Sequence, residues 1–78
     1  MNGKSFLFGY SIVKGDSQRA KDIINLCNEK GIPLSSVTLE EDERFSLYVP
    51  LFYERKLISF AKSEKIELSV ISRRGVAS

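Results

Sequence analysis

The spacing of the apolar side chains changes repeatedly along this chain, and this pattern constrains the fold more than any single motif. Apolar residues recur at every second position in four segments, as in half-buried strands, and at every third or fourth position in two segments, as in amphipathic helices. The predicted order is strand, helix, strand, strand, helix, strand. With 78 residues only one domain fits, so residues 1–78 are expected to share one core.

The first half of the chain predicts a strand followed by a well-marked helix. The strand is expected from Ser5 to Lys14, with its core-facing side chains predicted to be Phe6, Phe8, Tyr10 and Ile12. A helix through Lys30 follows, because Asp16 or Ser17 can cap its free first-turn amides. Gly31 tolerates the left-handed conformation that ends helices, so the helix is expected to stop there.

The second half repeats this order without repeating the sequence. Strands are predicted at 34–39 and 44–51, joined as a hairpin by the acidic run 40–43. Helical spacing returns over 52–65, and a last alternating segment runs from Ile66 to about Arg73. In the clearest strand, 44–51, the side chains expected to face the helices are Phe45, Leu47 and Val49.

This β-α-β-β-α-β order predicts an α+β domain of the ferredoxin-like type. Its sheet would be antiparallel with four strands in the order 4-1-3-2, and both helices would cover one face. The first and third strands would then be central, which agrees with their length and apolar content.

Residues for catalysis or for binding metals and cofactors are scarce. The chain has no histidine, which removes the commonest general base and metal ligand. Cys27 lies on the predicted inward face of the first helix, so we expect it to be a buried core residue and not a reactive thiol. The acidic run lacks the ligand spacing of a calcium loop, and the glycines do not form a phosphate-binding pattern. We therefore expect no catalytic residue, no metal, no cofactor and no enzyme activity.

The charge balance does not indicate a nucleic-acid partner. The chain carries 12 basic and 10 acidic residues, which is too even to suggest a polyanion. With Phe45 and its alternating neighbours facing the helices, Tyr48 would be the only aromatic residue on the open face of the sheet. The first strand would present small and aliphatic residues there, so the platform on which RNA bases stack would be missing.

A partly apolar open face is expected to be an interaction surface for a protein partner or for self-association. The alternative is ordinary scatter of apolar residues over a protein surface. The residues predicted for this surface are Leu7, Val13, Tyr48, Ile71, Arg73 and Arg74.

The sequence also predicts a cytoplasmic setting. The single cysteine cannot form an internal disulfide, and the N-terminus lacks the continuous apolar stretch of a signal peptide. No window approaches the roughly 18 apolar residues of a membrane-spanning helix.

Three segments together resemble the N-terminal region of the YqfD family of putative stage IV sporulation proteins. They are the aromatic-apolar first strand ending near Lys14, the stretch 24–33 with its cysteine and its Gly-Ile-Pro end, and the closing segment 72–75. The resemblance implies a role in sporulation. In longer family members the last segment leads into a membrane span, so Arg73 and Arg74 would be membrane-proximal only if a parent chain continues past Ser78.

Two functional hypotheses follow. The first is a non-catalytic protein-interaction domain that docks through its sheet face or an exposed strand edge. The alternative is a small-ligand sensor similar to ACT regulatory domains, with its ligand near the first loop, residues 14–17.

Overall fold

The structure is a computed structural model that describes residues 6–75, and it has the predicted β-α-β-β-α-β order. A 3-10 turn, Ser17–Arg19, immediately precedes the first helix. The strands and helices are β1 (Tyr10–Asp16), α1 (Ala20–Lys30), β2 (Ser35–Leu39), β3 (Arg44–Pro50), α2 (Leu51–Ser63) and β4 (Ser69–Arg74).

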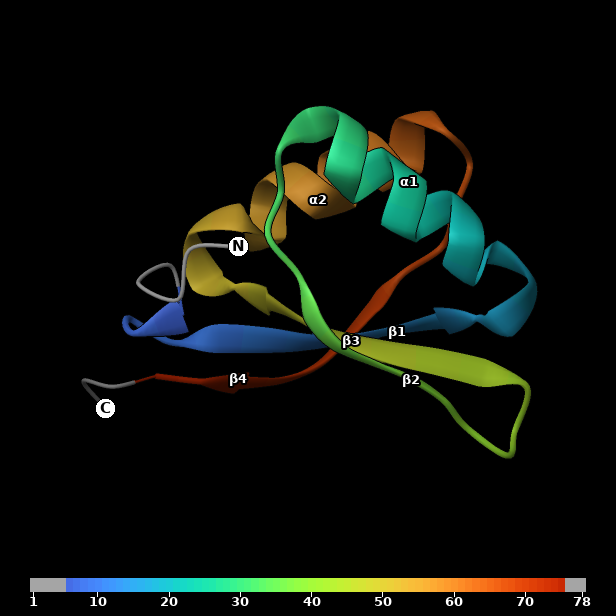
Figure 1. Cartoon of the computed structure of the whole chain (residues 1–78), viewed down its shortest axis with the longest axis horizontal. Coiled ribbons are helices and arrows are strands. Elements are labelled where there is room, and N and C mark those ends of the chain that lie inside the picture. The colour runs from blue at the N-terminus through green and yellow to red at the C-terminus, as the bar shows by residue number, and fades with distance from the viewer. Residues whose placement is uncertain (1–5, 76–78) are drawn as a thin grey trace.

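The strands form one antiparallel sheet in the order β2-β3-β1-β4, which confirms the predicted α+β ferredoxin-like topology. Both helices lie against one face of this sheet, and the other face is left without helices (Figure 1). The central strands are β1 and β3, as predicted. The predicted bounds of β2, β3 and α2, which were 34–39, 44–51 and 52–65, agree with the observed bounds within one or two residues.

The register of β1 is the main correction to the sequence analysis. Val13 is fully buried and Ser11 and Gly15 are also buried, whereas Tyr10 and Ile12 are partly exposed. Tyr10 and Ile12, which were predicted to face the core, therefore face away from the helices. Ser5, the predicted first residue of the strand, lies outside the described residues.

Pairing with β3 explains this register. Phe45, Leu47 and Val49 are fully buried, and they pair directly with Gly15, Val13 and Ser11. Residues that pair directly project to the same face of the sheet. The inward-facing residues of β3 therefore determine which residues of β1 also face inward. The small side chains of β1 also suit a crowded face. A Cβ added at Gly15 would lie 2.7 Å from the Phe45 ring.

The start of β1 was also predicted too early. Gly9 has φ +109° and donates its amide to the Phe6 carbonyl, so the chain turns before the strand begins at Tyr10. Similarly, β4 begins at Ser69 rather than Ile66, because the Ile66 amide donates to the Ala61 carbonyl at the end of α2 and is not part of the sheet.

The core lies between the helices and the inward face of β1 and β3. Its buried apolar members are Val13, Ala20, Ile23, Leu26, Cys27, Ile32, Phe45, Leu47, Val49, Leu57, Ala61 and Ile66. Cys27 is fully buried, as predicted, and burial raises the pKa of its thiol to about 11. The thiol is therefore protonated at neutral pH.

Both helices end in the same hydrogen-bonding pattern with different residues at the turn. The Ile32 amide donates to the Cys27 carbonyl and the Ile66 amide donates to the Ala61 carbonyl, each over 2.8 Å. The preceding residues, Gly31 and Lys65, have φ of 68° and 60°. This is the Schellman arrangement, in which glycine avoids the strain that a side chain introduces.

This contrast predicts opposite effects for two substitutions. Gly31→Ala should lower the free energy of unfolding by about 1 kcal/mol, because nothing lies near the added methyl group and only backbone strain changes. Lys65→Gly should raise it by about 0.5 kcal/mol, since relief of strain exceeds the added freedom of the unfolded chain. Urea denaturation measures both values. Equal destabilisation by the two variants would contradict the left-handed assignment of Lys65.

Candidate functional site

Two tyrosine rings lie on the central strands of the sheet face that the helices leave uncovered, towards the end where β1 begins. Tyr10 from β1 and Tyr48 from β3 stack with ring centroids 4.8 Å apart and planes inclined by 16°. Ile12 pairs directly with Tyr48 and with Ser72 of β4, so these residues share the same face. We call the surface formed by Tyr10, Ile12, Lys14, Tyr48 and Ser72 the open face.

The presence of Tyr10 on the open face overturns the reasoning used against a stacking platform. From the sequence, Tyr48 was the only aromatic residue expected there, because β1 was predicted in the opposite register. The face carries two aromatic residues, but their rings stack on each other. Each ring thus offers at most one free side to a further group.

The six residues predicted as an interaction surface do not share one face. Val13 was placed wrongly, since it is fully buried under the helices. Tyr48 lies on the open face as predicted, and Arg74 pairs with Tyr10 at its end. Leu7 precedes β1, whereas Ile71 is the extra residue at an irregularity where the β1–β4 register shifts, and both are more than half exposed.

Arg73, the sixth of these residues, belongs to a polar network on the helix side of the sheet. Its Nε and Nη2 atoms donate to the two carboxylate oxygens of Glu54 over 2.7 and 2.9 Å. The hydroxyl of fully buried Ser11 donates to the same carboxylate. The network thereby ties α2 to β1 and to the edge strand β4.

This network lowers the pKa of the Glu54 carboxyl group. The hydrogen bond from Arg73 lowers its pKa most, and the Ser11 hydroxyl lowers it further, while burial opposes both effects. The same pairing raises the pKa of Arg73. At neutral pH both groups are charged, and Arg73 is therefore committed to an intramolecular contact.

A second ion pair neutralises the cation of the open face. Lys14 contacts Glu40, and its Nζ atom lies 3.8 Å from Asp42. The hydrogen bond with Glu40 raises the pKa of Lys14. Part of the acidic turn therefore has a structural partner, which its composition alone did not indicate.

An exposed apolar cluster was missed by the sequence analysis. Phe8 and Phe52 are 65% and 77% exposed, and their rings meet edge to face with centroids 6.0 Å apart. Phe8 was expected in the core, but the turn at Gly9 leaves it outside the sheet. No periodicity argument could bring these two residues together, because they are 44 positions apart.

A groove with a volume of about 790 Å³ lies beside the ends of β1 and α2. We call it the basic groove, because four of its lining residues are arginine or lysine. It includes Asp16 from the first loop, where the sensor hypothesis placed a ligand. Its lining is Asp16, Arg19, Arg44, Ile58, Lys62, Lys65, Ile66, Glu67, Leu68 and Ser69.

Comparison with protein families identifies the chain. The family model described as "Putative stage IV sporulation protein YqfD" matches residues 5–78, which is nearly the whole sequence. The chain belongs to the YqfD family. Comparisons with curated proteins and with solved structures found no significant match.

The segments that carried the resemblance have clear structural roles in this YqfD-family chain. Cys27 is in the core and Gly31 forms the left-handed turn after α1. Arg73 anchors β4 to α2 through Glu54. Ser78 lies outside the described residues. Within residues 6–75, no helix has the length and apolar content needed to cross a membrane.

Proposed function

We propose that this YqfD-family chain is a non-catalytic protein-interaction domain that docks through its open face, and that the occupant is a second copy of the same face. The observation that carries the proposal is the stacked pair Tyr10 and Tyr48 on the two central strands of an uncovered sheet face. Tyrosine is enriched among the residues that contribute most to binding at protein interfaces. A paired sheet would place both rings in a buried centre.

Charge favours a matching protein face over a polyanion. Lys14 of the open face is already neutralised by Glu40 and Asp42 of the same chain. Two copies can therefore approach without strong repulsion between their centres. Arg74 lies beside Tyr10 at one end of the sheet and the acidic turn lies at the other end, and the ends of an interface are ordinarily polar.

The size of the face sets the expected strength of pairing. Four strands spaced about 4.8 Å apart, with about 3.3 Å per residue, offer a face of roughly 20 by 20 Å. This is about 400 Å², compared with about 800 Å² buried per partner in a standard interface. We therefore expect a weak dimer, with a dissociation constant of roughly micromolar or higher. A small domain also gains stability when such a surface is buried.

Sedimentation equilibrium over a range of concentrations tests the proposal. The unmodified chain should approach twice its monomer mass of 8.8 kDa as concentration rises, whereas Tyr48→Glu should remain a monomer. The glutamate places a charge at the centre of the paired faces, where its desolvation is unfavourable. Ser59→Glu adds the same charge on an exposed part of α2 and should still dimerise.

Two results would contradict the proposal. If the unmodified chain and Tyr48→Glu are both monomers at millimolar concentration, a second copy is not the occupant. If Tyr48→Glu and Ser59→Glu weaken the dimer equally, pairing uses another surface. Circular dichroism of the three proteins checks that each is folded.

A further inference from the structure

The basic groove has an apolar floor and a charged rim contributed by elements distant in sequence. Ile58 and Leu68 lie on α2 and on the segment that leads into β4. The last pair between β1 and β4 is Lys14 with Ser69, so Gly15 and Asp16 extend beyond the start of β4. Because β4 begins late, a hollow remains between the end of β1 and α2.

The excess positive charge of the chain is concentrated at this rim. The groove is lined by four basic and two acidic side chains, an excess equal to the net charge of +2 of all 78 residues. The smaller groove on the other side of Arg19, about 500 Å³ in volume, has three acidic and two basic residues. Of these two grooves, the larger one therefore favours an anion.

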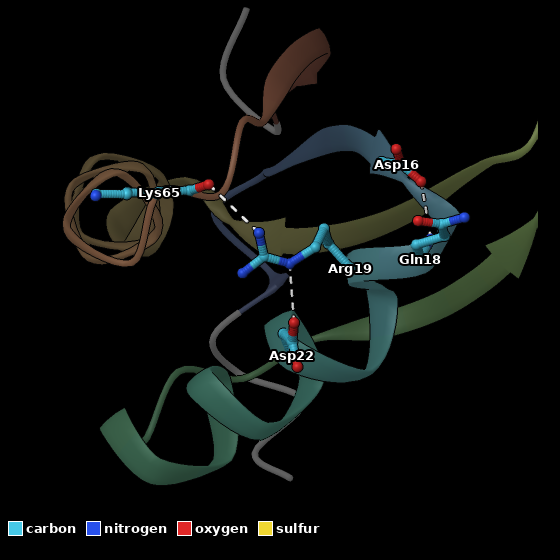
Figure 2. A network of polar contacts seen from close by, with 5 residues as sticks. All are labelled: Asp16, Gln18, Arg19, Asp22 and Lys65. Carbon is cyan, nitrogen blue, oxygen red and sulfur yellow. Dashed lines mark hydrogen bonds and ion pairs between the residues drawn. The ribbon is translucent and has the colours of Figure 1, made fainter.

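Most of these cations are available to a ligand. Among the ion pairs found within residues 6–75, none involves Arg44, Lys62 or Lys65. Arg19 is held in place, because its Nε atom donates to Asp22 over 2.8 Å and its Nη1 atom donates to the Lys65 carbonyl over 3.4 Å (Figure 2). Its guanidinium thus bridges the start of α1 and the end of α2. A guanidinium fixed in this way loses little side-chain entropy when it binds an anion.

Asp16 lowers the positive charge of this rim without cancelling it, because the groove has four basic and two acidic side chains. One carboxylate oxygen of Asp16 accepts a hydrogen bond from the Gln18 amide over 2.9 Å (Figure 2), so it is engaged in capping the turn before α1. A volume of about 790 Å³ lies within the range of small-molecule sites, which combine apolar walls with a few polar groups that fix orientation.

We propose that the basic groove binds a small organic anion, with a carboxylate or phosphate against Arg44, Lys62 and Arg19 and an apolar body over Ile58 and Leu68. This site lies at the end of β1, next to Lys14 of the open face, and it goes beyond docking because it adds a ligand to the domain. Charge-assisted hydrogen bonds to the rim supply orientation, and the apolar floor selects against small inorganic ions.

Two dyes that differ mainly in charge test the site. 1-Anilinonaphthalene-8-sulfonate has an anionic group on an apolar body, and N-phenyl-1-naphthylamine has nearly the same body without the charge. The sulfonate should bind more tightly, with amide shifts in a two-dimensional NMR spectrum centred on Arg19, Arg44 and Ser69. Inorganic phosphate should shift the amides of the rim only, and more weakly.

Two matched variants locate the charge effect. Lys62→Glu should weaken binding of the sulfonate dye by about tenfold, because it reverses an exposed charge of the rim. It should leave the neutral dye unaffected. Lys56→Glu makes the same reversal on the same helix, outside the groove lining, and should bind the sulfonate dye like the unmodified chain.

Three outcomes would overturn the proposal. The first is equal affinity for the two dyes. The second is equal weakening of sulfonate binding by Lys62→Glu and Lys56→Glu. The third is that the shifts are centred on Phe8 and Phe52, which would mean that the dye only covers the exposed apolar cluster. None of these outcomes bears on the dimer measured by sedimentation, so the two proposals can fail separately.

Discussion

Val13→Asp is expected to unfold the domain, whereas Ile12→Asp should leave it folded with a loss of about 1 kcal/mol. Val13 is fully buried between β1 and the helices, and Ile12 lies partly exposed on the open face. An unpaired carboxylate in the core costs several kcal/mol. A chain of this size has a total stability of about 4–12 kcal/mol, so the loss is comparable to the whole.

Far-UV circular dichroism and the dispersion of amide signals in NMR spectra distinguish the two variants. If Val13→Asp does not accumulate as a folded protein, substitution by threonine at the same two positions allows the free energies of unfolding to be compared. Val13→Thr should lower the free energy of unfolding by about 1–2 kcal/mol, and Ile12→Thr by less than half of that. The reverse ranking in either pair would show that β1 has the opposite register and that Val13, not Ile12, belongs to the open face.

Glu54→Ala is expected to lower the free energy of unfolding by about 1–3 kcal/mol, because it leaves the buried hydroxyl of Ser11 without its acceptor. The double variant Ser11→Ala with Glu54→Ala should lose less than the sum of the two single variants, since no hydroxyl then remains unpaired. Glu67→Gln, which changes an exposed carboxyl outside this network, should have little effect. Urea denaturation of the four variants measures the coupling, and strict additivity would contradict it.

The same carboxylate predicts an acid-dependent loss of stability. The pKa of Glu54 is lowered in the folded chain, mainly by Arg73, from its ordinary value of 4.5. The stabilisation is therefore present above that value and is lost as the pH falls through it towards the lower folded pKa. Glu54→Gln lacks this pH-dependent stabilisation, because its side chain does not ionise. The difference in stability between the unmodified chain and Glu54→Gln should be largest at neutral pH and should shrink in acid. A difference that stays constant with pH would rule out this role for the charge.

The sequence alone determined the order and type of all six elements and the strand order of the sheet. Apolar periodicity and helix ends are local properties, so Phe45, Leu47 and Val49 could be assigned to the core, and Gly31 to the end of α1, from their neighbours along the chain. The antiparallel arrangement then followed from general rules for short connections. The first strand and the segments 24–33 and 72–75 also carried the family resemblance, which the family match confirmed.

Only the tertiary structure decided the register of β1 and the positions of the candidate sites. Strand β1 carries apolar residues in both phases, so local periodicity could not show that Val13 faces the helices and Tyr10 the open face. Pairing with β3 selected the phase, because opposite residues share a face and the inward side of β3 leaves room for only small groups at Gly15. The Tyr10–Tyr48 stack, the Ser11–Glu54–Arg73 network and the basic groove all join residues from distant segments. Such contacts depend on how the elements pack across the sheet, which is why the fold could be predicted from the sequence and the surfaces that it forms could not.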